Sequence, residues 1–208
     1  MDKKSFLQAG HTPTLIAAFL YFDLAFMVWV ILGPLAVGIA ADLGLSHAQK
    51  GLIVATPVLA GAILRMIMGV VVDRLSPKKA AIIGQLVVIG ALAYAWLVGV
   101  HSFNEVLVLG VFLGVAGASF AAALPLASRW YPPEHQGTAM GIAGAGNSGT
   151  AFAALFAPGL AMAFGWHNVF GLALIPLVIV LVAFCFMAKD APDAPPPKRF
   201  AEYLAVLR

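Results

Sequence analysis

Asp23, Arg65 and Asn147 each stand within a long apolar stretch of the sequence. Arginine carries a planar, permanently charged guanidinium that binds a planar oxyanion through two parallel hydrogen bonds. Asparagine offers both a donor and an acceptor, and aspartate can take up and release a proton. A charged side chain in the centre of an apolar helix costs at least about 2.5 kcal/mol, so such a residue indicates a functional site. Together the three residues predict a binding site for a small anion, with Arg65 as its main contact.

The composition decides which elements must position these residues. Of the 208 residues, 62% are hydrophobic and only 10% are charged, and the mean hydropathy is +0.98. A soluble globule of this size cannot bury so much apolar surface. The composition therefore excludes a soluble enzyme and a nucleic-acid binder, and the single Cys185 excludes a disulfide framework. We predict an integral membrane protein.

Six apolar stretches are long enough to cross about 30 Å of hydrocarbon as helices. They cover residues 13–40, 51–72, 80–100, 106–127, 137–164 and 169–188. The polar loops between them are short, so consecutive helices are expected to be antiparallel neighbours. The predicted fold is an all-α transmembrane bundle of six helices over residues 13–188. A tail at 1–12 precedes it, and a proline-rich linker follows at 189–208, ending in an interfacial amphipathic turn or the start of another span.

The basic residues predict the orientation of the bundle. Ten of the 12 Lys and Arg lie in the tails and in the loops on one side of the membrane, and Lys50 alone lies on the other. Basic residues concentrate on the cytoplasmic side of membrane proteins. Both ends of the chain are therefore predicted to be cytoplasmic, and the net charge of +3 reflects contact with the bilayer rather than with nucleic acid.

The three polar residues are predicted to lie at one depth in the membrane. With a helix rise of about 1.5 Å per residue, Arg65 lies about 12 Å, Asp23 about 15 Å and Asn147 about 16 Å from the cytoplasmic surface. The same calculation places Ser119 about 15 Å from the cytoplasmic surface. This layer is close to the bilayer midplane, where transporters build their substrate sites.

A glycine-rich stretch, GIAGAGNSGT at 141–150, surrounds Asn147. Glycine lets a ligand or a neighbouring helix lie directly against the backbone. Gly144, Gly146 and Gly149 are therefore predicted to line the anion site, with pure helix packing as the alternative. The same glycines match a dinucleotide-binding pattern, but no βαβ unit surrounds them, so we reject that interpretation.

The other candidate residues give weaker predictions. Phe26 lies one helical turn from Asp23 and is expected on the same face, where it lines the cavity or packs against a neighbour. The five histidines fall at or beyond the ends of the predicted spans, so neither a metal site nor a paired-histidine haem site is predicted. We expect no cofactor and no enzymatic activity.

The loop after the second predicted span resembles a signature of the major facilitator superfamily. The matching residues in GVVVDRLSPKK at 69–79 are Gly69, Asp73, Arg74, Lys78 and Lys79. Ser76 and Pro77 stand where the superfamily usually has Gly-Arg. The resemblance implies that this segment is a gating loop.

Three further segments resemble the nitrate/nitrite porter family, the NarK-type carriers, within that superfamily. AGAGNSG at 143–149 is similar to the glycine-rich nitrate signature of the family. GAILR at 61–65 is similar to the segment whose arginine binds nitrate, which is Arg65 in this chain. LAFMVW at 24–29 is similar to the segment that brings a phenylalanine, here Phe26, to the substrate.

The resemblance implies the architecture and the activity. Members of the family have twelve spans in two halves, bind the substrate between the halves, and transport by rocking one half against the other. A second arginine comes from the C-terminal half, which would be the missing partner of this chain. The resemblance implies the N-terminal half of a nitrate/nitrite transporter of the cell (inner) membrane. A carrier of another small anion is the alternative, and a non-transporting membrane anchor is disfavoured.

Asp23 raises the question of energy coupling. The inside-negative potential opposes entry of a monovalent anion by about 2.3 kcal/mol per 100 mV, so an importer must bring in more than one positive charge with it. We predict proton-coupled nitrate import with Asp23 as the proton carrier. In the alternative, Asp23 neutralises Arg65 and the carrier exchanges nitrate for nitrite.

Overall fold

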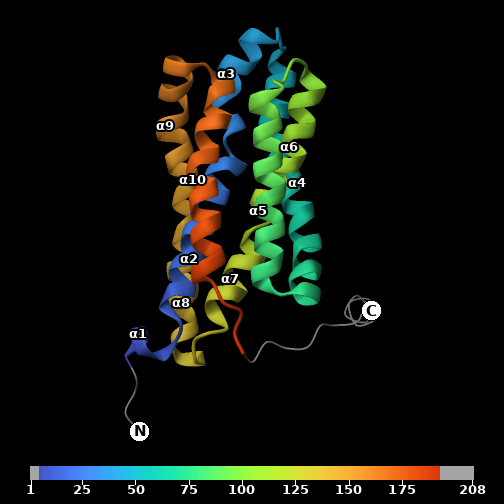
Figure 1. Ribbon diagram of the computed structural model, residues 1–208. Helices are drawn as coiled ribbons and strands as arrows, with labels where there is room; N and C mark the ends of the chain where they lie inside the picture. Colours follow the sequence, from blue (N-terminus) through green and yellow to red (C-terminus); the bar gives the residue numbers. More distant parts are fainter. Residues whose placement is uncertain (1–4, 193–208) are drawn as a thin grey trace, which may run out of the picture.

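The computed structural model describes residues 5–192 and shows an elongated helical bundle (Figure 1). Every regular element within these residues is a helix, in agreement with the predicted all-α fold. The predicted linker beyond residue 192, including its final amphipathic stretch, lies outside the described residues, as do the first four residues of the predicted tail. The elements are α1 (Phe6–Ala9), α2 (Thr12–Trp29), α3 (Leu32–Asp42), α4 (His47–Leu75), α5 (Pro77–Leu97), α6 (Phe103–Gly117), α7 (Phe120–Ser128), α8 (Pro133–Gly144), the 3₁₀ turn η1 (Ala145–Ser148), α9 (Gly149–Phe164) and α10 (Trp166–Met187).

Five stretches of the described chain are long and apolar enough to cross a membrane. They are Thr12–Asp42, His47–Leu75, Pro77–Leu97, Phe103–Ser128 and Trp166–Met187. The predicted fifth span at 137–164 is divided by η1 into α8 and α9, which have 12 and 16 residues and are stacked end to end in Figure 1. The sequence predicts this span but not its interruption.

Two of the long stretches are also interrupted, one of them at a proline. Pro34 has no amide hydrogen to donate to the Val30 carbonyl, so α2 ends at Trp29 and the Gly33 N–H bonds to Val30 instead. Between α6 and α7, the Ala121 N–H donates to the Ala118 carbonyl at 3.0 Å. In a continuous helix the Ala121 N–H would bond to Gly117. The break thus leaves the Gly117 carbonyl for another donor.

Both ends of the described chain lie at the same end of the bundle (Figure 1). The Lys189 N–H donates to Thr14 Oγ1 at 2.9 Å, and Trp130 Nε1 donates to the Lys189 carbonyl at 2.7 Å. These bonds hold the start of α2, the turn after α7 and the chain after α10 together. The chain therefore crosses the bundle an even number of times.

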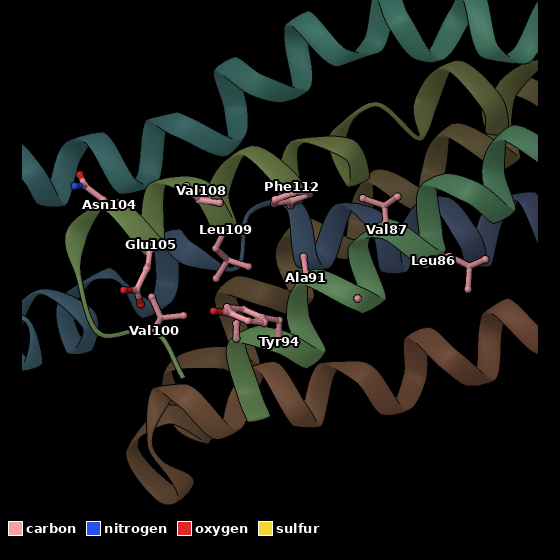
Figure 2. Close-up of a pocket in the computed structure, with 12 residues that line it drawn as sticks. Leu86, Val87, Ala91, Tyr94, Val100, Asn104, Glu105, Val108, Leu109 and Phe112 are labelled. Atoms are coloured by element: carbon pink, nitrogen blue, oxygen red, sulfur yellow. The ribbon is translucent and has the colours of Figure 1, made fainter. Parts of the chain in front are cut away.

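A groove of about 670 Å³ runs along the outside of the bundle between α5 and α6 (Figure 2). Its walls are mostly apolar, with Tyr94, Asn104 and Glu105 toward the loop that joins the two helices. None of the predicted site residues lines it. The groove is therefore not the anion site that the sequence predicts.

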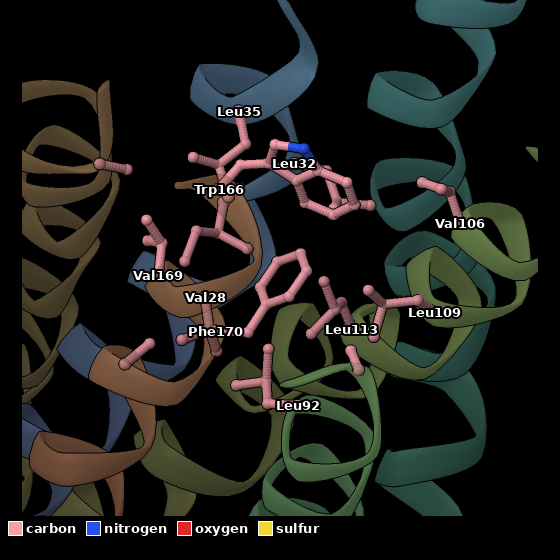
Figure 3. Close-up of a cluster of buried hydrophobic side chains, with 14 of the residues drawn as sticks. Val28, Leu32, Leu35, Leu92, Val106, Leu109, Leu113, Trp166, Val169 and Phe170 are labelled. Atoms are coloured by element: carbon pink, nitrogen blue, oxygen red, sulfur yellow. The ribbon is translucent and has the colours of Figure 1, made fainter. Parts of the chain in front are cut away.

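The larger hydrophobic core packs α2, α3, α5, α6 and α10 together around the fully buried Phe170 (Figure 3). Val28, Leu32, Leu92 and Leu113 surround this ring and have at most 1% of their surface exposed. A second buried cluster near the opposite end contains Tyr21, Phe22 and Phe184. By contrast, α4 leaves much of its apolar surface exposed, including Leu59, Ile63, Met66 and Ile67.

The turn between α4 and α5 contains a strained residue. Ser76 has φ 148° and ψ 159°, a region that is essentially restricted to glycine and costs a non-glycine residue about 1–3 kcal/mol. Its hydroxyl accepts from the Lys79 N–H at 3.3 Å and caps α5. This is the position at which the superfamily signature usually has glycine, and the backbone conformation explains that preference.

We expect Ser76→Gly to stabilise the protein by about 1 kcal/mol, because strain relief exceeds the few tenths lost with the cap. The measurement is the midpoint of thermal unfolding in detergent micelles. Ser46→Gly is the matched control, because Ser46 caps α4 at an ordinary φ of −65°. The control should lower the midpoint, and a Ser76→Gly midpoint that falls as far would contradict the assignment of strain.

Candidate functional site

Arg65 lies on α4, half-buried, opposite the break between α6 and α7. Its Nη2 donates to the Gly117 carbonyl at 3.1 Å, which is the carbonyl that the break leaves open. Its Cζ lies 5.1 Å from the centroid of the Phe120 ring, within the range of a cation–π contact. Nε is buried and has no hydrogen-bond partner within residues 5–192. The guanidinium is thus held on one side, while part of its donor capacity is unused.

Asp23 lies on α2 with 6% of its surface exposed. Ser148 Oγ donates to Asp23 Oδ1 at 2.6 Å. Within residues 5–192 no ion pair joins Asp23 to Arg65, because these two side chains bond to different partners. The alternative in which Asp23 neutralises Arg65 by direct pairing is therefore not what the structure contains.

The glycines of the signature stretch face two directions. A Cβ at Gly146 would lie 2.8 Å from the Phe22 ring and 2.9 Å from the Asp23 backbone nitrogen. A Cβ at Gly149 would overlap the backbone of Asp23 and lie 2.9 Å from the Met27 nitrogen. Gly146 and Gly149 therefore allow close packing of this stretch against α2.

Gly144 and Asn147 lie on the other side of the same stretch. No atom of residues 5–192, apart from those of its own helix, lies within 4 Å of a Cβ built at Gly144. Asn147 is exposed, and its backbone carbonyl accepts from Thr150 Oγ1 at 2.9 Å. These two residues face open space rather than α2.

A row of aromatic rings connects the two halves of the layer. Phe120 lies 5.8 Å from Phe22 and Phe22 lies 4.1 Å from Phe26, measured between ring centroids. Phe26 is 4.7 Å from Trp29 and has 6% of its surface exposed. A series of ring contacts therefore runs from Phe120, which lies against Arg65, to the part of α2 that carries Asp23.

Trp29 joins two of the segments that resemble the NarK-type family, the one at 24–29 and the one at 61–65. Its Nε1 donates to the Pro57 carbonyl at 2.8 Å. A Cβ at Gly61 would lie 2.8 Å from this Nε1, and a Cβ at Gly117 would overlap the indole ring. The indole thus fits between α4 and α6, where it sets the position of Arg65 one helical turn beyond Gly61.

Sequence reasoning missed Phe120 and Ser148. Phe120 touches Arg65, and Ser148 is the hydrogen-bond partner of Asp23. The only available signals were their positions, since Phe120 follows Ser119 in the predicted layer and Ser148 follows Asn147. Phenylalanine and serine are too common in apolar helices for their type alone to mark a site.

The predicted gating loop lies at the ends of α4 and α5. The Lys78 N–H donates to Asp190 Oδ1 at 3.0 Å, and Lys78 Nζ donates to the Cys185 carbonyl at 2.8 Å. A carboxylate thus meets the N-terminus of α5 and an ammonium meets the C-terminal carbonyls of α10, which is the favourable arrangement for both helix dipoles. Asp73 and Arg74 lie in the last turn of α4, and Gly69 has open space beside it.

The fold is that of one half of a major-facilitator-type transporter. The profile of the Major Facilitator Superfamily matches residues 16–208, so the chain belongs to the major facilitator superfamily. The human organic anion transporter MFSD10 (TETRAN) has a similar fold, with a TM-score of 0.70 at 17% identity over 92% of this chain and 52% of that transporter.

Sequence relatives confirm the resemblance to NarK-type carriers. The chain is 33% identical over 184 residues to the probable nitrate/nitrite transporter NarK2 of Mycobacterium tuberculosis, covering 88% of this chain and 47% of the relative. It is 32% identical over 154 residues to the nitrite extrusion protein of Bacillus subtilis, covering 74% and 38%. It is 33% identical over 142 residues to the probable nitrate/nitrite antiporter NarK1 of Thermus thermophilus, covering 68% and 31%. The chain thus spans about half the length of these relatives or less.

We expect Gly149→Ala to destabilise the protein by about 1–3 kcal/mol, because the new methyl group would overlap the backbone of α2. Gly144→Ala is the matched control in the same stretch and should be neutral or slightly stabilising, since its methyl group meets open space. The midpoint of thermal unfolding in detergent measures both. A larger loss in Gly144→Ala than in Gly149→Ala would show that the packing face is misassigned.

Proposed function

We propose that this chain is the N-terminal half of a nitrate/nitrite transporter that works by alternating access. The observation that carries the proposal is the state of Arg65, a permanent positive charge in the membrane layer that has no carboxylate partner within residues 5–192. An unpaired charge at this depth is costly, and an anionic ligand offsets the cost. The names of the relatives support nitrate and nitrite as that ligand.

The substrate would lie on the open side of this bundle, between Arg65 and Asn147. Arg65 would supply a forked contact to the anion, Phe120 an aromatic face beside it, and Asn147 a donor to a further oxygen. Gly144 would let the substrate or the second half approach the backbone. A C-terminal six-helix half with its own arginine would close the site, as the family resemblance implies.

We also propose that the protein lies in the cell (inner) membrane with both ends of the chain in the cytoplasm. The two ends of the described chain lie together, and the loops at that end carry the basic residues Arg74, Lys78, Lys79 and Arg129. Basic residues favour the cytoplasmic side. No catalytic step is proposed.

For energy coupling, we propose proton-coupled nitrate import with Asp23 as the proton carrier. Asp23 is the one acidic residue among the described residues that lies in the membrane layer of the site, and it bonds to the turn next to Asn147. Nitrate/nitrite exchange is the second candidate. It is favoured by the Ser148 hydroxyl that already donates to the Asp23 carboxylate, which an exchanger never needs to protonate.

Arg65→Lys should weaken nitrate binding at least about tenfold, because an ammonium cannot make the two parallel hydrogen bonds of the guanidinium. Nitrate binding to the purified complete carrier measures this directly. Arg129→Lys makes the same exchange at the end of α7 and should bind nitrate as the wild type does. Near-normal affinity in Arg65→Lys would remove Arg65 from the substrate site.

Asp23→Asn separates proton coupling from substrate binding. In proteoliposomes we expect this variant to retain nitrate counterflow, which moves no net charge, and to lose uptake driven by a pH gradient. Counterflow in the same vesicles is the internal control. Unchanged pH-driven uptake in Asp23→Asn would exclude the proton role, and a wild type that responds to no pH gradient would support exchange.

A further inference from the structure

The groove between α5 and α6 has the length of a site for one lipid chain. Its volume is about 670 Å³, and its lining on α6 runs from Asn104 to Phe112 (Figure 2). Eight residues of helix rise about 12 Å, which is close to half of the hydrocarbon thickness of about 30 Å. The groove therefore covers about one leaflet of the bilayer, starting at the loop that joins the two helices.

The wall of the groove is open and apolar around Gly90. No atom of residues 5–192, apart from those of its own helix and its chain neighbours, lies within 4 Å of a Cβ built at Gly90. Val87 and Phe112 line the groove beside it and are exposed. An acyl chain suits such a wall, because it gains from dispersion contacts and needs no hydrogen-bond partner.

Glu105 gives the loop end of the groove a negative charge. Its carboxylate accepts from the His101 N–H at 2.8 Å and from Ser102 Oγ at 3.0 Å, which fixes its direction. A carboxylate can accept about four hydrogen bonds, so this one has room for another donor. Tyr94 and Asn104 lie at the same end (Figure 2), and no lysine or arginine is among the described residues that line the groove.

The helix α5 lies on the side of α2 that faces away from the glycine-rich stretch. Tyr21 Oη on α2 lies 3.8 Å from a Cβ built at Gly84 of α5. The backbone nitrogen of Asp23 lies 2.9 Å from a Cβ built at Gly146 of η1. Tyr21 and Asp23 are two residues apart and therefore point about 200° apart around the helix. A second half that closes the anion site would thus leave the groove on α5 to the bilayer.

We infer that this groove binds phosphatidylethanolamine, with one acyl chain against Gly90 and the primary ammonium of the headgroup at Glu105. An ammonium has three donors and no acceptor, so it complements the free capacity and the charge of the carboxylate. A quaternary ammonium lacks these donors, and the carboxylate repels a headgroup of net negative charge. The inference concerns a surface outside the substrate site, so it does not depend on which anion the protein carries.

Photoactivatable lipids test the inference in proteoliposomes of the complete carrier. Traces of phosphatidylethanolamine or phosphatidylglycerol, with the same diazirine-bearing acyl chain, are activated in a phosphatidylcholine bilayer, and the labelled peptides are identified by mass spectrometry. Phosphatidylethanolamine should label residues 103–112 about threefold more than phosphatidylglycerol, as expected for one exposed ion pair.

A second groove serves as the internal control. It lies between α5 and α10, has a volume of about 600 Å³, and is lined by residues such as Asn168 and Ile179, with no charged side chain among its described lining residues. Residues 171–179 should therefore be labelled equally by the two lipids.

Two variants separate the headgroup contact from the chain contact. Glu105→Gln keeps an acceptor for the loop but removes the charge, and it should make the two lipids label 103–112 equally. Gly90→Leu fills the groove and should lower labelling of 103–112 by phosphatidylethanolamine at least about fivefold. Ile83→Phe enlarges an exposed side chain of α5 that does not line the groove, and this control should label as the wild type does.

Each outcome bears on the inference. Equal labelling of 103–112 by the two lipids in the wild type would overturn it, as would wild-type labelling in Gly90→Leu or a preference that survives in Glu105→Gln. If Glu105→Gln fails to fold, the lipid comparison and Gly90→Leu still decide. The measurement needs no substrate, so a carrier that binds no nitrate would refute the proposed function and leave the lipid site to be decided by labelling alone.

Discussion

Within the membrane every polar group of the backbone must find its partner inside the protein, because hydrocarbon offers none. The candidate site lies beside interruptions of the helices, where the regular backbone hydrogen bonds of a helix are broken. The break between α6 and α7 leaves the Gly117 carbonyl, which accepts from Arg65. The 3₁₀ turn between α8 and α9 carries Ser148, whose hydroxyl donates to the Asp23 carboxylate on α2. The two charged residues of the layer are thus held by the helix interruptions.

Close approach of the helices makes these contacts available. In a bilayer, association depends on packing and interhelical hydrogen bonds rather than on the hydrophobic effect. Gly61 and Gly117 make room for Trp29, while Gly146 and Gly149 let the signature stretch lie on the backbone of α2. The row of phenylalanines between Arg65 and Asp23 fills the space between these two contact regions. The two charged residues, the glycines and the aromatic rings therefore form one connected set of packing contacts.

The distribution of buried and exposed surface fits a half carrier of the major facilitator superfamily. Gly144 and Asn147 face open space, and α4 exposes a long apolar surface beside Arg65. The chain matches the superfamily over residues 16–208 but spans about half the length of its nitrate/nitrite relatives or less. The unpaired Arg65 and the exposed Asn147 would form a closed site only with further groups opposite them.

The sequence by itself determined the helical class and the six apolar stretches, and it predicts a common depth for Asp23, Arg65 and Asn147, because length and helix rise depend only on residue number. It did not determine rotation about each helix axis, which depends on the packing of all neighbours. Only the tertiary structure therefore decided that Asp23 bonds to Ser148 and not to Arg65, and that Gly149 faces α2 while Gly144 does not. The break at η1 has the same origin. Without a proline to mark it, the interruption depends on contacts with α2 that a linear pattern does not contain.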